Sequence, residues 1–515
     1  MSLFLGLDSS TQGLKAEIID VAGGNIIFSE SVNFTKDLPE YNCPEGCLEN
    51  SDILVKHADP LMWLAALDMV FANLAKAGAP LDKVAGISGS GQQHGSVYLK
   101  KEFSTILAGL DPDKNLPEQV APALARKSSP IWMDRSTAEE CRELQTEFDE
   151  RLQQDTGSPA IERFTGAQIR KFYKDQPDLY NDTAHIHLVS SFMASVLSGK
   201  NAYIDYGDGA GMNLLNLKSL EWDQEIVEFT APDLINKLPK VVPSNTVCGG
   251  LSHYFSKYGF KENIPVIVWS GDNPCSLIGM GASEPGVAVI SLGTSDTFFA
   301  AMTDFKTDPK GCGHVFGNPA GGFMSLICFT NGSLAREKVK NDTGVTWKYF
   351  DSLPDCKTKA GNCGNLMLPY FSAESTPLVL EPAVKYSGSP EFCCGKVEAE
   401  VKIRAILESQ ALSMKLHSEW MGEVFTRIRV TGGASSCTPF LQILADVFQA
   451  RIEKIAISDS AGLGAALRAA NAVDSVPFGE LYDKFTATKE IIYPDKNNAA
   501  VYKDALKRYS ELENK

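Results

Sequence analysis

The chain has no long hydrophobic run and no excess of positive charge. No stretch approaches the roughly 18 consecutive apolar residues that a membrane-spanning helix requires, so we expect no membrane partner. The 48 Lys and Arg residues stand against 64 Asp and Glu residues, which gives a net charge of −16. So acidic a chain is poorly suited to bind a polyanion, and we expect no nucleic-acid partner. An anionic substrate would have to be held locally, by backbone amides and a few cations.

The sequence also lacks the usual nucleotide-binding signatures. Glycines are grouped at residues 86–91, 432–433 and 462–464, but no group completes G-x-G-x-x-G between a strand and a helix. The motif G-x-x-x-x-G-K-[ST] is absent as well. If ATP binds, a different scaffold must hold it.

The spacing of the cysteines favours neither a zinc site nor disulfides. Cys43 and Cys47 have no second pair of ligands to complete a zinc site, and neither do Cys312 and His314. Some of the 12 cysteines are direct neighbours, which rarely bond to each other. The chain opens without a signal peptide, so we expect free thiols and a cytoplasmic location.

The length of the chain favours two domains. A sequence of 515 residues, 44% of them hydrophobic, is too long for one core and long enough for two domains of about 250 residues each. Prolines and a glycine pair interrupt weakly periodic sequence at residues 238–263, which is typical of a boundary. We therefore predict one domain at residues 1–260 and a second at 264–515. Beyond Phe478 we expect a short polar tail of helix and loop.

The two halves show the same order of elements. In the first half we expect three antiparallel strands, a helix and a further strand, at residues 3–7, 14–19, 25–32, 60–77 and 84–88. In the second half we expect a strand-turn-strand unit, a helix, a strand and a helix, at residues 286–299, 401–420, 427–430 and 439–448. A further helix is expected at residues 137–154. The pattern predicts an α/β fold in which a βββαβα unit is duplicated.

One carboxylate lies where α/β folds place their chemistry. An apolar strand at residues 264–269 leads into Gly271-Asp-Asn-Pro274, so Asp272 follows the carboxyl end of a strand. In a phosphoryl-transfer enzyme such a carboxylate accepts the proton of an alcohol that is in line with a γ-phosphate. The same tetrapeptide also suits a turn or a helix N-cap, so both interpretations stay open.

Two polar turns are candidates for binding phosphate. The turn at residues 8–13 offers backbone N–H groups, the hydroxyl of Thr11 and the carboxylate of Asp8, which suit a phosphate chain and its magnesium ion. Gly293-Thr-Ser-Asp296 has a similar composition, and two such loops could hold the β- and γ-phosphates between them. Each turn alone is equally compatible with a simple hairpin.

Two further turns carry candidate binding residues. Gly432 and Gly433 lie between a strand and a helix, where a backbone without side chains lets a ligand approach closely. The alternative is an ordinary tight turn. His94 lies in a glycine-flanked loop after a strand, and it could bind a polyol or simply be a surface histidine.

Taken together, the motifs resemble those of the FGGY family of carbohydrate kinases, most closely its eukaryotic branch that acts on xylulose. The resemblance spans nearly the whole chain and is carried by Gly6-Leu-Asp-Ser-Ser-Thr-Gln12, Gly91-Gln-Gln-His-Gly95, Trp132-Met-Asp134, Glu162-Arg-Phe-Thr-Gly166, Asp205-Tyr-Gly-Asp-Gly-Ala-Gly-Met-Asn213, Gly271-Asp-Asn-Pro274, Ser291-Leu-Gly-Thr-Ser-Asp-Thr297 and Thr431-Gly-Gly-Ala-Ser435. It implies a duplicated actin-like, ribonuclease-H-like ATPase fold, whose two domains enclose a cleft for ATP, Mg²⁺ and a sugar. The implied reaction is the ATP-dependent phosphorylation of D-xylulose to D-xylulose 5-phosphate.

The resemblance also implies roles for individual residues. Asp272 resembles the general base, and the positions that match sugar-binding residues are His94, Arg163 and Asn273, with Asp134 nearby. The positions that match nucleotide-binding residues are Thr11, Gln12, Lys15, Thr294, Trp347, Gly432 and Gly433, with Asp8 on the magnesium side. Cys437 stands where the branch usually has Asn, and a thiol is a much weaker hydrogen-bonding group than a carboxamide.

Two alternatives remain open from the sequence. A kinase of another polyol, such as ribulose or glycerol, would share the fold, because pocket loops decide the substrate. A non-catalytic sugar- or nucleotide-binding regulator would be expected to lack the aspartate after Gly271, and Asp272 is present. The sequence leaves open whether the chain forms a homo-oligomer.

Overall fold

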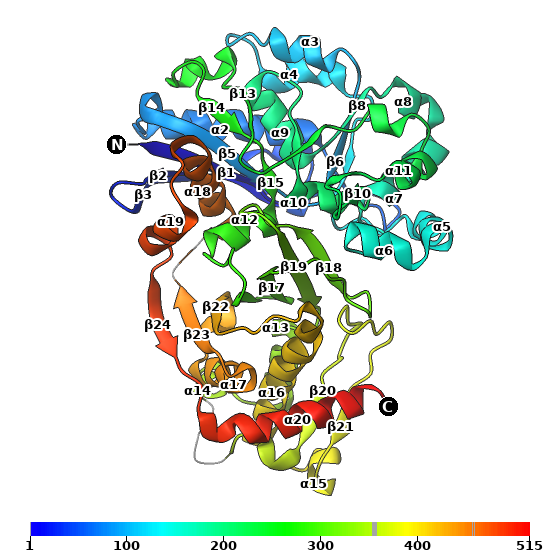
Figure 1. Ribbon diagram of the computed structural model, residues 1–515, viewed down its shortest axis with the longest axis vertical. Coiled ribbons are helices and arrows are strands. Elements are labelled where there is room, and N and C mark those ends of the chain that lie inside the picture. Colours follow the sequence, from blue (N-terminus) through cyan, green and yellow to red (C-terminus); the bar gives the residue numbers. More distant parts are fainter. Residues whose placement is uncertain (1, 353–357, 456, 458) are drawn as a thin grey trace. The chain divides into compact units, whose positions relative to one another are not determined.

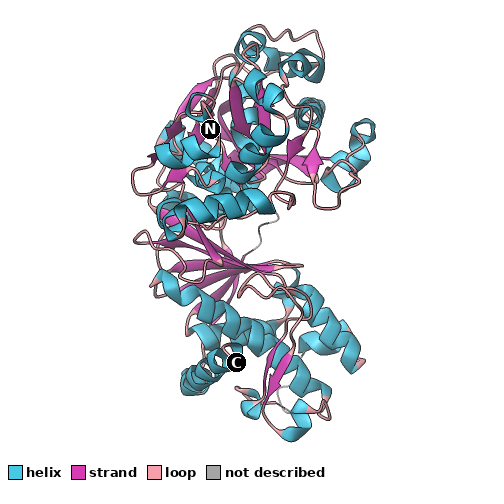
Figure 2. Cartoon of the chain, turned by 90° about the vertical axis from the view of Figure 1, so that its right-hand side faces the viewer, coloured by secondary structure: helices cyan, strands magenta, loops and turns pink. Residues whose placement is uncertain are grey.

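Two α/β units make up the chain. The computed structural model describes residues 2–352, 358–455, 457 and 459–515. One compact unit comprises Met1–Gly281, Val315–Phe323 and Ser458–Thr486, and the other comprises Ala282–His314, Met324–Ile457 and Ala487–Lys515. Figure 2 shows that strands form a sheet in each unit and that helices pack against it.

The first unit is built on a seven-stranded sheet. Its strand order is β13-β14-β5-β1-β2-β3, and β15 also pairs with β5. The strands are β1 (Leu3–Ser9), β2 (Gly13–Asp20), β3 (Asn25–Asn33), β5 (Val84–Gly91), β13 (Val247–Gly250), β14 (Pro265–Ile267) and β15 (Ser270–Gly271). β1 and β2 are antiparallel, as are β2 and β3, whereas β5 runs parallel to β1 and to β14.

Helices cover both faces of this sheet (Figure 1). On one face, α2 (Pro60–Lys76) and α9 (Val189–Ser198) share a buried apolar core with the odd-numbered residues of β1. On the other face, α18 (Ser460–Asp474) packs against β1 and β5. A β-carbon at Gly6 would come within 2.0 Å of the carbonyl oxygen of Gly462, so this close helix–strand contact requires glycine.

The first unit also contains smaller elements around the main sheet. Its remaining strands are β4 (His57–Ala58), β6 (Ser96–Leu99), β7 (Ser129–Pro130), β8 (His185–Leu188), β9 (Ile204–Asp205), β10 (Leu215–Asn216), β11 (Glu221–Trp222) and β12 (Val241–Val242). Its remaining helices are α1 (Phe34–Asp37), α3 (Phe103–Ala108), α4 (Leu116–Val120), α5 (Ala138–Phe148), α6 (Glu150–Thr156), α7 (Thr165–Asp175), α8 (Pro177–Asp182), α10 (Tyr206–Gly209), α11 (Gln224–Thr230), α12 (Asp272–Gly279) and α19 (Phe478–Phe485).

The second unit repeats the strand order of the first. Its sheet has the order β18-β19-β17-β16-β22-β23-β24. The strands are β16 (Val287–Leu292), β17 (Asp296–Met302), β18 (Gly313–Gly317), β19 (Phe323–Phe329), β22 (Arg427–Thr431), β23 (Arg451–Ile455) and β24 (Thr488–Ile492). As in the first unit, an antiparallel hairpin is followed across the sheet by two parallel strands. The predicted α/β fold with a duplicated strand pattern is confirmed.

Helices pack against the second sheet and enclose its core. Apolar side chains of α16 (Ala399–Ser418), α17 (Thr438–Phe448) and α20 (Ala499–Glu513) form one buried cluster with residues of β16, β22 and β23. The other elements are α13 (Ser333–Thr343), α14 (Trp347–Ser352), α15 (Pro390–Cys393), β20 (Leu366–Leu368) and β21 (Lys385–Ser387).

Several local expectations differ from the structure. The helix expected at residues 137–154 is two helices, α5 and α6, because Asp149 between them has a φ of 48°, which a continuous helix cannot contain. The expectation of a polar tail was wrong, because β24 extends the second sheet and α20 buries Tyr502 and Tyr509. Residues 264–281, which we placed with the second domain, have their contacts in the first unit, since β14 and β15 pair with β5.

The structure also bears on membrane association and thiol state. Within the described parts of the chain, no helix combines the length and the apolar character needed to cross a membrane. The cysteines that the structure describes are all free thiols.

Candidate active site

The sheet of the first unit brings three loops to one edge. Asp8 of β1 lies opposite Ser90 of β5, and Ser270 of β15 lies opposite the same Ser90. Because these strands are parallel, the loops that leave their carboxyl ends meet at one edge of the sheet. These loops are residues 8–13, residues 91–95 and the turn into α12, which carry Thr11, His94 and Asp272.

Asp8 is a buried carboxylate that lacks a full set of partners. Its Oδ1 accepts no hydrogen bond, and burial raises its pKa to about 8, with Asp459 and Asp272 adding to the shift. Asp459 caps α18 by accepting from Gly462 N at 3.1 Å, while its Oδ2 lacks a hydrogen-bond partner and lies 3.9 Å from Lys15 Nζ. Carboxylates that raise one another's pKa are a site where a cation is stabilised.

The residues around Asp8 suit magnesium better than a metal ion whose ligands all come from the protein. Among the described residues, no three His, Cys, Asp or Glu side chains form a ready-made metal centre. Magnesium commonly takes one or two protein carboxylates and completes its shell with water and phosphate oxygens. Asp8 and its orphaned oxygen match that pattern.

His94 is held as a neutral ring beside Arg163. Its Nδ1 lies 2.8 Å from Gly211 O, and because a carbonyl can only accept, Nδ1 carries the proton and Nε2 is left as an acceptor. Burial, followed by the charge of Arg163, lowers the His94 pKa to about 3. The ring stacks on Phe164 with 4.4 Å between centroids, and the Arg163 guanidinium lies 5.6 Å from the same Phe164 ring. His94 therefore offers a lone pair, and Arg163 offers donors, which together suit hydroxyl groups.

Asp272 and Asn273 form one hydrogen-bonded group with Gln93. Asp272 Oδ1 accepts from Asn273 N at 2.8 Å and from Asn273 Nδ2 at 3.0 Å, and the same Nδ2 donates to Gln93 Oε1 at 2.8 Å. Burial raises the pKa of Asp272 to about 6, although these N–H groups favour its charged form. A carboxylate with a pKa near neutrality is suited to accept a proton from an alcohol.

Asp134 is buried, and its hydrogen bonds hold together the segments around this site. Its Oδ2 accepts from Lys56 N at 2.8 Å. Its Oδ1 accepts from Ser136 N at 2.9 Å, Ser136 Oγ at 2.7 Å and Gln168 Nε2 at 2.8 Å. These bonds tie Lys56, Ser136 and Gln168 to Asp134, whereas a direct contact between Asp134 and a sugar stays a prediction.

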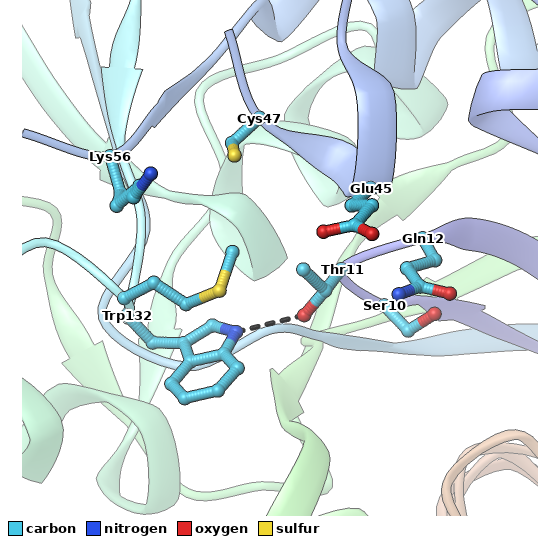
Figure 3. A pocket seen from close by; sticks show the side chains of 8 residues that line it. Ser10, Thr11, Gln12, Glu45, Cys47, Lys56 and Trp132 are labelled. Atoms are coloured by element: carbon cyan, nitrogen blue, oxygen red, sulfur yellow. Dashed lines mark hydrogen bonds between the residues drawn. The ribbon is translucent and has the colours of Figure 1, made fainter. Parts of the chain in front are cut away.

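A cavity of about 530 Å³ opens beside the first loop (Figure 3). It is lined by Ser10, Thr11, Gln12, Glu45, Cys47, Lys56, Trp132 and Met133. Trp132 Nε1 donates a hydrogen bond to Thr11 Oγ1 at 2.8 Å. In the sequence, Trp132 stands out only as part of a motif, because nothing near it in the chain signals a partner 121 positions away.

In the second unit, buried charges fix the loop 293–296. Arg336 makes two bonds to Asp296, from Nη1 to Oδ2 at 2.7 Å and from Nη2 to Oδ1 at 3.0 Å. Ser333 N at the start of α13 donates to Gly293 O at 3.0 Å and to Thr294 O at 3.1 Å. The Thr294 side chain is exposed, so the backbone of this loop is fixed while its hydroxyl stays accessible.

The two glycines after β22 differ in their surroundings. Gly432 has a φ of 91°, and a β-carbon there would lie 2.4 Å from Leu292 O, so only glycine fits. A β-carbon at Gly433 would meet nothing within 4 Å, which leaves open space above the backbone. Such space suits the close approach of a flat ligand.

Trp347 is the first residue of α14 and Cys437 directly precedes α17, and these two helices pack together. Trp347 begins α14 with 42% of its surface exposed, and Lys340 Nζ lies 5.0 Å from its ring. Cys437 is buried, its thiol donates to Asp351 O at 3.7 Å, and burial raises its pKa to about 11. Trp347 is thus available to a ligand, whereas the thiol of Cys437 faces the protein.

The predicted site residues fall into two groups. In the first unit the structure groups Asp8, Thr11, Gln12 and Lys15 on one hairpin, and it joins His94 to Arg163 and Asp272 to Asn273 through the contacts described above. In the second unit it places Thr294, Trp347, Gly432, Gly433 and Cys437. The roles assigned to these residues stay predictions.

The family models and the sequence relatives point to one family. The model of the N-terminal domain of the FGGY family of carbohydrate kinases matches residues 125–279, and that of the C-terminal domain matches residues 288–473. The chain is 38% identical to xylulose kinase 2 of Arabidopsis thaliana, over 100% of this chain and 97% of that relative. It is also 38% identical to the xylulose kinase of Rattus norvegicus, over 99% and 96% of the two chains.

Solved structures share the fold at lower identity. The xylulose kinase from Rhodospirillum rubrum superposes with a TM-score of 0.84 at 20% identity, covering 99% of this chain and 98% of that one. The glycerol kinase of Plasmodium falciparum, solved with ADP, gives a TM-score of 0.78 at 18% identity, with the same coverage.

Proposed function

Because the chain belongs to the FGGY family of carbohydrate kinases, we propose that it transfers the γ-phosphoryl group of ATP to the 5-hydroxyl of D-xylulose. The products are D-xylulose 5-phosphate and ADP. The observation that carries the proposal is Asp272, a carboxylate with its pKa raised to about 6, positioned beside polar groups at the edge of the sheet. Full-length similarity to xylulose kinases supports the choice of sugar.

In the proposed reaction, Asp272 accepts the proton of the 5-hydroxyl as that oxygen bonds to the γ-phosphorus. The bond between the γ-phosphorus and the bridging oxygen breaks, and ADP leaves with its electrons. Asn273 holds Asp272 Oδ1 through two N–H groups, so the carboxylate keeps its orientation. Asp272 then releases its proton to water after the product departs.

Sugar binding is assigned to the group around His94. Its Nε2 accepts a hydrogen bond from one hydroxyl, and Arg163 donates to others, because a guanidinium has five N–H groups in a fixed fork. Asn273 is a third sugar ligand in this proposal, and Asp134 maintains the segment that carries Trp132. Neutral His94 adds no charge that would compete with Asp272.

Nucleotide binding is assigned to both units. Thr11, Gln12, Lys15 and Thr294 contact the phosphates, while Gly432, Gly433, Trp347 and the neighbourhood of Cys437 contact the adenosine. Asp8 would hold magnesium, which supplies positive charge to the β- and γ-phosphates when bound. The orphaned Oδ1 of Asp8 supports that role.

We also propose that the enzyme works in the cytoplasm without nucleic-acid or membrane partners. Its net charge of −16 disfavours anionic polymers, and its described cysteines are free thiols. Whether it forms a homo-oligomer is a question for size measurement in solution.

The test is an ADP-release assay with D-xylulose, L-xylulose, D-ribulose, glycerol and gluconate, on the wild type and on Asp272→Asn. We expect D-xylulose to give the highest kcat/KM and the variant to lose at least about a hundredfold, since general-base catalysis contributes roughly 10²–10⁴. A preference for another polyol would refute the substrate. An active Asp272→Asn variant would refute the assigned base.

A further inference from the structure

Trp132 is a large apolar side chain that the protein leaves 44% exposed. It lines the cavity of about 530 Å³ beside the loop 8–13. Its indole nitrogen points at the Thr11 hydroxyl, and the two atoms are 2.8 Å apart (Figure 3). Trp132 has no part in the proposed reaction, although it touches a proposed phosphate ligand.

The backbone around the tryptophan is held firmly. Ile131 N donates to Lys56 O at 3.0 Å, and Arg135 N donates to Leu54 O at 2.8 Å. Between them, the buried Asp134 accepts from Lys56 N at 2.8 Å. Hydrogen bonds on both sides of the tryptophan therefore fix the backbone position from which its side chain extends.

Thr11 is held from a second direction. Gly46 lies against it so closely that a β-carbon at Gly46 would come within 1.8 Å of Thr11 O. The next residue, Gln12, accepts from Phe34 N through its carbonyl at 3.0 Å. The backbone of the loop is thus fixed, and the remaining freedom of Thr11 is the rotation of its side chain and of its hydroxyl hydrogen.

The chemistry of the indole sets the direction of the hydrogen bond. An indole N–H can only donate, so the Thr11 oxygen must be the acceptor. A hydroxyl that accepts at its oxygen still has its own hydrogen to donate elsewhere. Phosphate oxygens can only accept, so a threonine held in this way presents to a phosphate the group that it needs.

We propose that Trp132 is a positioning residue that orients the Thr11 hydroxyl to donate a hydrogen bond to a phosphate oxygen of the nucleotide. The inference rests on the proposed function, in which loop 8–13 binds the phosphates. Trp132 acts through Thr11, and Lys56 and Asp134 keep the tryptophan in register with the loop.

The experiment is a double-mutant cycle on the full-length protein. The variants are Trp132→Phe, which keeps the aromatic ring but removes the N–H, Thr11→Val, which removes the hydroxyl, and the combination of both. We expect Trp132→Phe to lower kcat/KM for MgATP about fivefold, as the loss of one hydrogen bond would, with KM for the sugar within twofold of the wild type. In the Thr11→Val background, Trp132→Phe should have no further effect.

Two further variants separate positioning from general damage. Thr11→Ser keeps the hydroxyl, so adding Trp132→Phe to this variant should still lower kcat/KM for MgATP about fivefold. Trp222→Phe is the matched control, because Trp222 Nε1 also donates a hydrogen bond, to Pro239 O at 2.9 Å, and has no part in the proposed site. It should leave both KM values unchanged. Thermal unfolding of every variant shows whether the fold is intact.

Several outcomes would overturn the inference. Equal losses from Trp132→Phe in the wild-type and Thr11→Val backgrounds would show that the tryptophan does not act through Thr11. A loss confined to KM for the sugar would make Trp132 a wall of the sugar pocket instead. Calorimetric titration with magnesium and a non-hydrolysable ATP analogue repeats the cycle without turnover. Suppose that the wild type phosphorylates none of the sugars, but that Trp132→Phe still weakens binding of the analogue only when Thr11 is present. The proposed function would then be wrong, and this inference would stand.

Discussion

Lowering the pH from 7 to 5 should reduce kcat/KM for the sugar about tenfold, because Asp272 must be ionised to accept a proton. Burial raises the pKa of Asp272 to about 6, so its ionised fraction falls from about 0.9 at pH 7 to about 0.1 at pH 5. An aspartate with the ordinary pKa of 3.8 would stay about nine-tenths ionised or more at both values. The size of the loss therefore distinguishes a perturbed base from an ordinary surface carboxylate.

His94 should not account for this profile, although an ordinary histidine titrates in the same range. Its pKa is lowered to about 3, so the ring stays neutral from pH 5 to pH 7. Replacing it in His94→Gln should lower activity and leave the midpoint near 6. Asp272→Glu should instead move the midpoint, because the titrating group itself is changed.

The loss of activity should not reflect unfolding through Asp272. Its folded pKa lies above its unfolded value, so the folded state binds the proton more tightly. The contribution of this group to stability is therefore fully present below about pH 4 and is lost as the pH rises through about 6. Acidification over the tested range stabilises the fold at this position.

The assay measures initial rates of ADP release from pH 4.8 to 8 at limiting sugar and fixed MgATP, with circular dichroism at each pH. A profile that is flat between pH 7 and pH 5 would contradict the assignment of Asp272 as the base. So would a midpoint that stays in place in Asp272→Glu but disappears in His94→Gln. In that case the histidine would be the titrating group.

Two pairs of variants test how the first unit is supported. Gly46→Ala should destabilise the fold by about 2–4 kcal/mol and raise KM for ATP, because its φ of 84° strains an alanine and the new β-carbon would lie 1.8 Å from Thr11 O. Gly78→Ala, with a φ of 77° and nothing within 4 Å, is the matched control and should cost only about 1 kcal/mol in thermal or urea unfolding. Asp208→Asn should be tolerated within about 1 kcal/mol, because burial raises the pKa of Asp208 and so disfavours its charged form. Asp205→Asn, which removes the charge partner of the buried Arg468 3.6 Å away, should cost about 3 kcal/mol or more, and equal costs in these two variants would contradict the difference expected between the two carboxyl groups.

The sequence predicts what depends on local pattern. β1 is visible as a short apolar run because all its residues are buried, and the polar turn between β1 and β2 marks the hairpin. The helix expected at residues 137–154 failed because one residue, Asp149, adopts a φ of 48° that the apolar spacing on either side does not reveal. Strand β24 was missed because an edge strand with exposed residues lacks a buried alternation.

Pairing between distant segments explains the other differences. Residues 264–281 follow a stretch that is typical of a domain boundary, yet β14 and β15 add to a sheet that begins at Leu3. The hydrogen bonds that decide this are made with β5, some 180 positions earlier, and they leave no local trace. A linear reading assigns such a strand to the wrong neighbours even when it identifies the strand correctly.

For the candidate site as well, the sequence identifies single residues but not the contacts that they make. Resemblance to a family points to Asp272, His94 and Thr11 as single positions, because their motifs match residue by residue. It does not say that Thr11 accepts a hydrogen bond from Trp132 or that Asp8 lacks a partner at Oδ1. Those facts depend on how loops from different strands meet at the edge of the sheet. A buried carboxylate without a partner and a hydroxyl held by a donor are the features that favour a cation and a phosphate, and only the folded chain brings them together.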